Sequence, residues 1–179
     1  VVSVRLMKIH ATITNVTCNG AENGSISVTS NGLAPFTYAW SNGGTTDMIT
    51  GLAPGSYTVM ITDAAGCSET STIQISEPPV LTGQTSTSSA TCNTANGTAS
   101  VVPTGGTAPY SYLWSNSATS SMISGVSSGP YTVTVTDAKE CTVDLDAFVG
   151  ETGSPTVDAG SDLVITCASG PQISLNGSG

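Results

Sequence analysis

The residues best suited to chemistry in this sequence are its five cysteines, which follow a regular pattern. Cys67 lies 49 positions after Cys18, and Cys141 lies 49 positions after Cys92. Equal spacing in two halves predicts one disulfide in each half, Cys18–Cys67 and Cys92–Cys141. Reduced structural thiols are one alternative. Zinc binding is another, but the sequence has no C-x-x-C pair and only one histidine, His10.

Paired cysteines also predict a cellular location. Disulfides form and persist in oxidising surroundings, so we expect a secreted, extracellular, cell-surface protein. Closing a loop of about 50 residues would stabilise a domain by roughly 4 kcal/mol in the chain-entropy model. Cys167 has no counterpart in this scheme and is expected to be unpaired or to bond to another chain.

Charge and composition exclude several classes of function. Three Lys and Arg residues against twelve Asp and Glu give a net charge of −9, which argues against nucleic-acid binding. No apolar run approaches the roughly 18 residues of a membrane span. His10 lies beside Lys8 with no acidic residue near it in sequence, so we expect a surface strand residue and not a general base. The sequence therefore predicts no enzyme.

An internal repeat with an offset of 74 residues organises the chain. The segment APFTYAWSN, which begins at Ala34, has its counterpart in APYSYLWSN, which begins at Ala108. The cysteines obey the same offset, since Cys18 matches Cys92 and Cys67 matches Cys141. The two copies should therefore have one fold.

Apolar and polar residues alternate within each copy, as at Tyr57, Val59 and Ile61 and again at Ile9, Ala11 and Ile13. This period of two is typical of half-buried strands, and turn signals separate the runs. The predicted fold class is all-β, with tandem Ig-like antiparallel β-sandwiches arranged as a rod. The aromatic residues in the inward register are expected in the cores: Tyr38, Trp40, Tyr57, Tyr112, Trp114 and Tyr131.

Proline-rich joints predict the domain boundaries. Glu77-Pro78-Pro79 should end the first repeat, because proline has no N–H to donate to a strand ladder. We expect an N-terminal strand segment at 1–8, the first sandwich at 9–78 and the second at 79–152. Residues 153–179 should be part of a third, Ig- or PKD-like module, since about 25 residues cannot close a sandwich core alone.

These blocks resemble the SprB-type repeat of large surface adhesins of Bacteroidetes, which include gliding-motility adhesins exported by type IX secretion. The likeness rests on the Pro-aromatic-Trp block and the Thr-Asp-…-Cys block, which occur twice within residues 6–149. It implies a surface filament or adhesin stalk and carries over no catalytic residue. The second copy differs from this pattern at two turns, where Ser117-Ala118 replaces a double glycine and Lys139-Glu140 replaces Ala-Gly.

Carboxylates could hold calcium, although we expect no resident cofactor. Asp63 and Asp137 open the turn before the last cysteine of each copy, where an Asx-turn is favoured over a calcium ligand. A second acidic group surrounds the later joint, where a solvated linker is favoured over interdomain calcium. Its members are Asp144, Asp146, Glu151, Asp158 and Asp162.

The sequence thus predicts a structural segment of a long secreted bacterial surface filament or adhesin stalk. Its expected partners are copies of itself or adjacent domains of the same long chain, head to tail, with no membrane span in this segment. The alternative is an extracellular module that binds glycans or proteins through loops at the sandwich ends. Trp40 and Trp114 could stack on sugars, but their inward register favours core packing.

Overall fold

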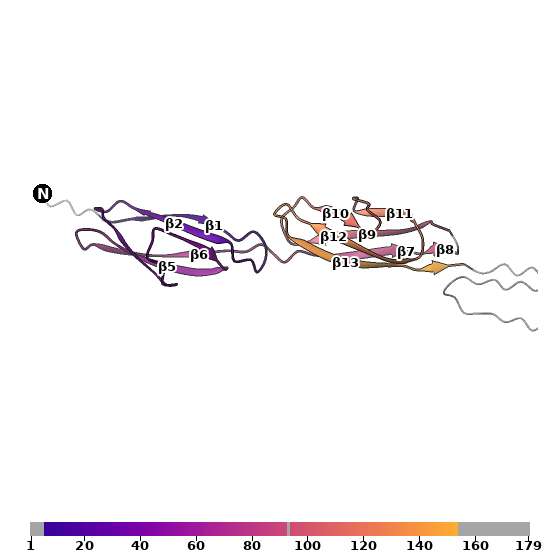
Figure 1. Cartoon of the computed structure of the whole chain (residues 1–179), viewed down its shortest axis with the longest axis horizontal. Coiled ribbons are helices and arrows are strands. Elements are labelled where there is room, and N and C mark those ends of the chain that lie inside the picture. The colour runs from indigo at the N-terminus through magenta and orange to yellow at the C-terminus, as the bar shows by residue number, and fades with distance from the viewer. Residues whose placement is uncertain (1–5, 93, 154–179) are drawn as a thin grey trace, which may run out of the picture. The chain divides into compact units, whose positions relative to one another are not determined.

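The computed structural model describes residues 6–92 and 94–153, in which every regular element is a strand (Figure 1). None of these stretches contains a helix with the length and apolar character that a membrane crossing needs. The chain forms two compact units. Of the described residues, the first unit holds those from 6 to 82 together with the loops Thr104–Pro109 and Asp137–Cys141, and the second holds the others.

The first unit is a sandwich of two three-stranded antiparallel sheets. The sheets have the strand orders β1-β2-β4 and β3-β5-β6. Their strands are β1 (Ile9–Thr14), β2 (Gly24–Ser30), β3 (Thr37–Trp40), β4 (Met48–Leu52), β5 (Gly55–Thr62) and β6 (Ser68–Ile75).

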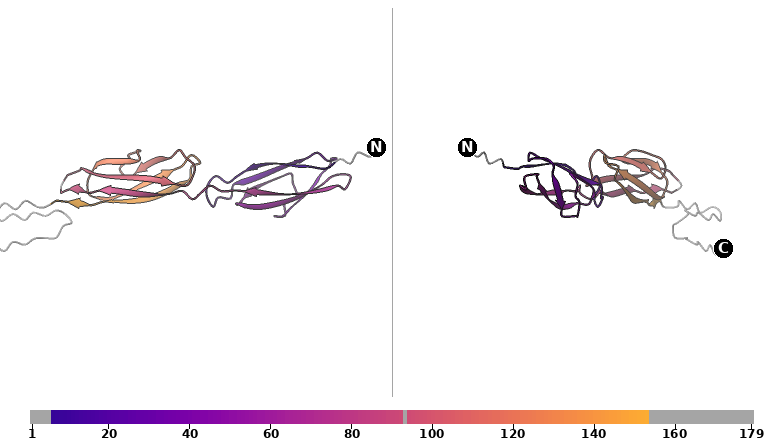
Figure 2. Two further views of the ribbon diagram at one scale, coloured as in Figure 1. Left: turned by 180° about the vertical axis from the view of Figure 1, so that it is seen from behind. Right: turned by 60° about the vertical axis from the view of Figure 1, so that its left-hand side comes forward.

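The second sandwich repeats this topology, with strand orders β11-β9-β7 and β10-β12-β13. Figure 2 shows the strands from two further sides. A short parallel pair, β8 with β14, joins the end of its first strand to the end of its last. The all-β, Ig-like sandwich fold is therefore confirmed. The strands are β7 (Thr82–Ser88), β8 (Ala90–Thr91), β9 (Gly97–Thr104), β10 (Ser111–Trp114), β11 (Met122–Val126), β12 (Gly129–Thr136), β13 (Thr142–Val149) and β14 (Glu151–Thr152).

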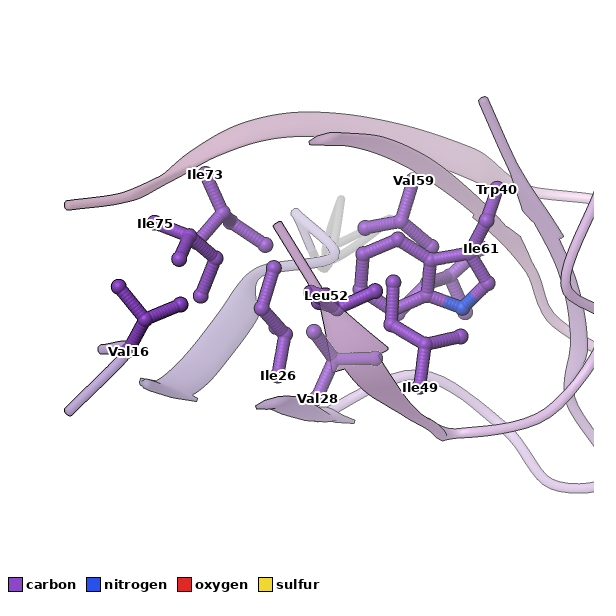
Figure 3. Packing of buried hydrophobic residues seen from close by; sticks show 10 residues of the cluster. All are labelled: Val16, Ile26, Val28, Trp40, Ile49, Leu52, Val59, Ile61, Ile73 and Ile75. Carbon is purple, nitrogen blue, oxygen red and sulfur yellow. The ribbon is translucent and has the colours of Figure 1, made fainter. Parts of the chain in front are cut away.

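Each sandwich encloses one core built around a tryptophan. Trp40 is 5% exposed and lies beside Val59 and Ile61 of β5, the central strand of its sheet (Figure 3). Its indole N–H donates to the Thr46 carbonyl at 2.8 Å, so the buried polar atom is satisfied. Trp114 is 1% exposed and donates in the same way to the Ser120 carbonyl.

The four tyrosines expected in the cores lie at the core margins. Tyr38 and Tyr57 are partly buried against the first core, as Tyr112 and Tyr131 are against the second. The Tyr57 hydroxyl donates to the Ala53 carbonyl at 3.0 Å, and Tyr131 makes the same bond one repeat later. A partly buried tyrosine commonly packs its ring against the core while its hydroxyl bonds to a backbone group.

The start of the first repeat differs from the prediction. Ile13 lies opposite the buried Ile26, yet 45% of its surface is exposed. The reason is that β1 is an edge strand of its sheet, with β2 as its partner there. Leu6–Lys8 are not part of a strand, and residues 1–5 of the predicted segment 1–8 lie outside the described residues. The same holds for the predicted third module from residue 154 onward.

The turns at which the second copy lacks glycine keep the glycine backbone. Gly43 has φ 87° and its counterpart Ser117 has φ 68°. Gly66 has φ 82° and its counterpart Glu140 has φ 66°. A side chain in this left-handed region costs roughly 1–2 kcal/mol relative to glycine. The repeat geometry thus holds these two residues in an unfavourable conformation.

We therefore predict that Ser117→Gly stabilises the second sandwich by about 0.5–1 kcal/mol, because part of the relieved strain is offset by greater freedom of the unfolded chain. The matched change Gly43→Ser should destabilise the first sandwich by a similar amount. A Cβ at Gly43 meets no atom within 4 Å, so this pair isolates the backbone effect. Urea unfolding followed by tryptophan fluorescence measures both, and an unchanged midpoint for Ser117→Gly would contradict the prediction.

Candidate functional site

The most distinctive feature of the described chain is a disulfide between Cys18 and Cys141, which are 123 residues apart in sequence. Their Cα atoms lie 5.7 Å apart, and both residues belong to the first unit. The predicted pairs Cys18–Cys67 and Cys92–Cys141 are therefore wrong. Cys67 is an exposed free thiol, whereas Cys92 takes part in a disulfide.

The length of β6 explains why the predicted disulfide between Cys18 and Cys67 does not form. Cys18 follows β1, and its loop lies at the end of β6, since the Val16 N–H donates to the Ser76 carbonyl at 3.3 Å. Cys67 comes just before β6 begins. β6 has eight residues, so the two cysteines are separated by about 26 Å of extended strand. A disulfide requires Cα atoms within about 7 Å, which excludes a bond inside one repeat.

The loop that carries Cys18 is fixed by its own side chains. The Thr17 N–H donates to Asn23 Oδ1 at 3.0 Å, and Asn23 Nδ2 donates to Thr17 Oγ1 at 2.8 Å. The Ala21 N–H donates to the Cys18 carbonyl at 3.1 Å, which closes a tight turn at the cysteine. These bonds fix the loop on both sides of Cys18.

The proline joint is bonded to this loop. Glu77 Oε2 accepts the Gly20 N–H at 2.8 Å, and the Pro78 carbonyl accepts Asn19 Nδ2 at 3.1 Å. The first bond is charge-assisted and therefore stronger than a neutral one. Glu77-Pro78-Pro79 thus has side-chain and carbonyl contacts of its own beyond the stiffness expected from its prolines.

The loop Thr104–Pro109 packs against the same joint within the first unit. The Gly106 N–H donates to the Pro79 carbonyl at 2.9 Å. Gly105 has φ 74°, and a Cβ there would lie 1.9 Å from the Val80 carbonyl oxygen. Only glycine fits so close a backbone approach at this dihedral angle.

Asp137 shapes the turn that presents Cys141. The side chain is 5% exposed, and its Oδ1 accepts the N–H groups of Lys139 at 2.8 Å and Cys141 at 2.9 Å. Its Oδ2 accepts the Thr107 N–H at 2.8 Å. Burial alone would raise the pKa of Asp137, but these backbone N–H groups outweigh it, so the pKa lies below its ordinary value.

Asp63 builds the same turn in the first repeat. Its Oδ2 accepts the Leu33 N–H at 3.2 Å, and its Oδ1 accepts the N–H groups of Ala65 and Cys67 at 2.9 Å each. The bonds from Leu33 and Cys67 contribute most to lowering the pKa of Asp63 below its ordinary value. The Asx-turn interpretation therefore accounts for both carboxylates.

The other proposed calcium ligands are also hydrogen-bonded or lie elsewhere. Asp144 accepts from the Thr134 hydroxyl at 2.6 Å, and Asp146 accepts from the Thr132 hydroxyl at 3.0 Å. No group of three or more His, Cys, Asp or Glu side chains suited to a metal gathers within residues 6–92 and 94–153. Further members of the predicted sites, Asp158, Asp162 and the unpaired candidate Cys167, lie outside the described residues.

A sugar-binding platform of exposed aromatic rings is not formed by the nine aromatic residues, all of which the structure describes. Phe148 is the one exposed ring, at 69%, and it lies within β13 and not in a loop. Trp40 and Trp114 are core residues. His10 is an exposed residue of β1, as predicted.

Several residues at this site were not singled out by the sequence reasoning. Glu77 was assigned to a linker, and Asn23 to a turn, without the bonds that hold the Cys18 loop. The repeat itself could have indicated the role of Asn23, because Asn96 holds the same place in the second copy. Asn96 bonds to Thr91 as Asn23 bonds to Thr17. Gly105 carried no such signal, since Asn31 stands at its place in the first repeat.

A family model described as the SprB repeat matches the chain at residues 10–45 and again at 84–119. The two matches are offset by the 74 residues of the internal repeat, so the recognition of two SprB repeats is confirmed. These repeats are non-enzymatic structural or binding domains. Among curated proteins, none matches this chain.

Several solved structures show a distant likeness to this chain. The Dpr2 Ig1-Ig2 and DIP-Theta Ig1-Ig3 complex matches at 15% identity, 82% of this chain, 67% of that chain and TM-score 0.34. A 282-residue C-terminal intimin fragment, solved with the intimin-binding domain of its translocated receptor, matches at 15% identity, 80% of this chain, 63% of that chain and TM-score 0.35. DIP-gamma IG1+IG2 matches at 12% identity, 83% of this chain, 98% of that chain and TM-score 0.39.

The Asp137 turn predicts a specific acid sensitivity. Folding lowers the pKa of this carboxyl, so its stabilising contribution is present above the ordinary value of 3.8 and is lost as the pH falls through the lower, folded value. We expect Asp137→Asn to reduce stability at pH 7 and to flatten the fall in stability below about pH 4. Asp63→Asn should likewise flatten the fall in stability at acid pH. Urea midpoints between pH 7 and pH 3 test this, and an Asp137→Asn curve parallel to that of the unmodified chain would contradict it.

Proposed function

We propose that this chain is a structural segment of a long bacterial surface filament or adhesin stalk, in which a disulfide connects successive SprB repeats. The coarser assignment, a surface-adhesin-type module with Ig-like sandwiches, follows from the two family matches and the strand topology. The filament role is supported by repetition, by the well-braced proline joint and by the position of the disulfide.

One observation carries this proposal: the Cys18–Cys141 bond encloses most of both repeats. Tension applied outside these two residues passes through the sulfur atoms and does not reach the enclosed strands. The 123 residue steps between the two cysteines would otherwise extend to roughly 400 Å. A stalk built this way resists lengthening even when its hydrogen bonds break.

The remaining parts of the proposal concern location and partners. A disulfide-bonded chain of this class would function outside the cell, after export by a route such as type IX secretion. Its partners would be adjacent domains of the same long chain or further copies of it, head to tail, in a rod. Surface glycans would be the partners of a binding module, but both tryptophans are buried and Phe148 is the one fully exposed ring, which gives that alternative little support.

Single-molecule pulling between the two chain ends tests the proposal. The oxidised chain should extend by about 400 Å less than the reduced chain, because the enclosed residues cannot lengthen. Without reductant, the double variant Cys18→Ser, Cys141→Ser should extend further than the oxidised unmodified chain, although the disulfide of Cys92 stays closed in it. Cys67→Ser is the matched control and should keep the short extension. Equal extension of the oxidised and reduced chains would contradict a load-limiting role for the bond.

A further inference from the structure

Cys67 is an exposed thiol at the position that corresponds to the disulfide-bonded Cys141. We propose that Cys67 forms a disulfide with the first cysteine of another SprB repeat that precedes this one. The last cysteine of each repeat would then bond to the first cysteine of the repeat before it. This inference deepens the proposed filament function and rests on it, since a stalk of many repeats supplies such a partner.

The turns that present the two cysteines have the same geometry. In each, the aspartate four residues earlier accepts the cysteine N–H at 2.9 Å through Oδ1. The aspartate N–H in turn donates to the cysteine carbonyl at 2.9 Å, for Asp63 with Cys67 and for Asp137 with Cys141. Each Oδ2 accepts an N–H from the neighbouring loop, Leu33 in one repeat and Thr107 in the other. Cys67 is therefore held as Cys141 is held.

The chain that leads into each repeat also packs in the same way beside these turns. Leu81 is 8% exposed and would be 3.1 Å from a Cβ on Gly106. Met7 holds the equivalent position in the first repeat, and its sulfur would be 2.9 Å from a Cβ on Gly32. The turn and the incoming chain beside Cys67 thus share these contacts with those beside the bonded cysteine in the second repeat.

The proposed partner is defined by the loop that carries Cys18. Its cysteine follows a threonine whose N–H and hydroxyl are both bonded to an asparagine side chain, Thr17 with Asn23. The second repeat has the same loop, in which Asn96 braces Thr91 and Cys92 follows. Such a loop is a general feature of the repeat, so a preceding repeat of this type offers the matching thiol.

The bond forms by thiol–disulfide exchange with a protein disulfide oxidant of the extracytoplasmic compartment. The Cys67 thiolate attacks one sulfur of the oxidant's disulfide, forms a mixed disulfide and expels a thiolate. The partner cysteine's thiolate then attacks Cys67 Sγ and expels the oxidant's second thiolate. Two protein thiols are oxidised, one disulfide of the oxidant is reduced to a dithiol, and the two protons pass to the expelled thiolates.

The first experiment replaces residues 1–8 of the chain with a copy of residues 9–82 that is marked by Glu22→Asp, so that 123 residue steps again separate the added repeat's first cysteine from Cys67. The extended chain is refolded in oxidised and reduced glutathione, then alkylated, digested without reduction and mapped by mass spectrometry. We expect a peptide that links Cys67 to the added repeat's first cysteine. Alkylation of Cys67 should fall about tenfold or more, because tethering gives the two thiols an effective concentration in the millimolar range. A version with serine at the added repeat's first cysteine is the matched control and should leave Cys67 alkylated.

The second arm distinguishes a partner repeat in the same polypeptide from one on another copy. The unmodified chain is mixed with a Cys141→Ser chain, whose Cys18 is then available. A covalent dimer linked through Cys67 and Cys18 supports pairing between copies, whereas bonding in the extended chain alone supports pairing along one polypeptide. The inference is overturned if Cys67 stays alkylated in both arms while Cys18–Cys141 forms normally. That result leaves the pulling test of the filament role unaffected, so the two failures are distinguishable.

Discussion

The structure depends on one geometric constraint: the two cysteines of a repeat lie at opposite ends of an eight-residue strand. About 26 Å of extended chain separates them, so neither can reach the other. Each cysteine must therefore bond to a different cysteine or stay a thiol. The disulfide between Cys18 and Cys141 is the consequence that the structure shows, and it closes a covalent loop of 123 residue steps.

The cysteines are useful for this purpose because rigid turns hold them. Each last cysteine follows an aspartate whose oxygens are saturated by backbone N–H groups, and burial of Asp137 makes that arrangement tightest in the second repeat. The first cysteine is held by an asparagine brace and, through Glu77, by the joint itself. A disulfide between positions already fixed in the folded state orders little additional chain.

The repeat and the sandwich fold were predictable from the sequence, and the disulfide connectivity was not. The 74-residue offset and the alternation at Tyr57, Val59 and Ile61 identify strands directly, because side-chain direction in a strand has a period of two. The spacing of 49 residues says how far apart two cysteines are along the chain but not at which end of the sandwich each lies. Only the contact between the chain that follows β1 and the end of β6, where the Val16 N–H donates to the Ser76 carbonyl, decides that.

The most direct test of the account is disulfide mapping of the unmodified chain. The oxidised protein is alkylated, digested with pepsin at acid pH to prevent exchange, and analysed by mass spectrometry before and after reduction. The account predicts one peptide pair that joins Cys18 to Cys141, together with alkylated Cys67. A peptide pair that joins Cys18 to Cys67 would contradict it, because each repeat would then be closed on itself.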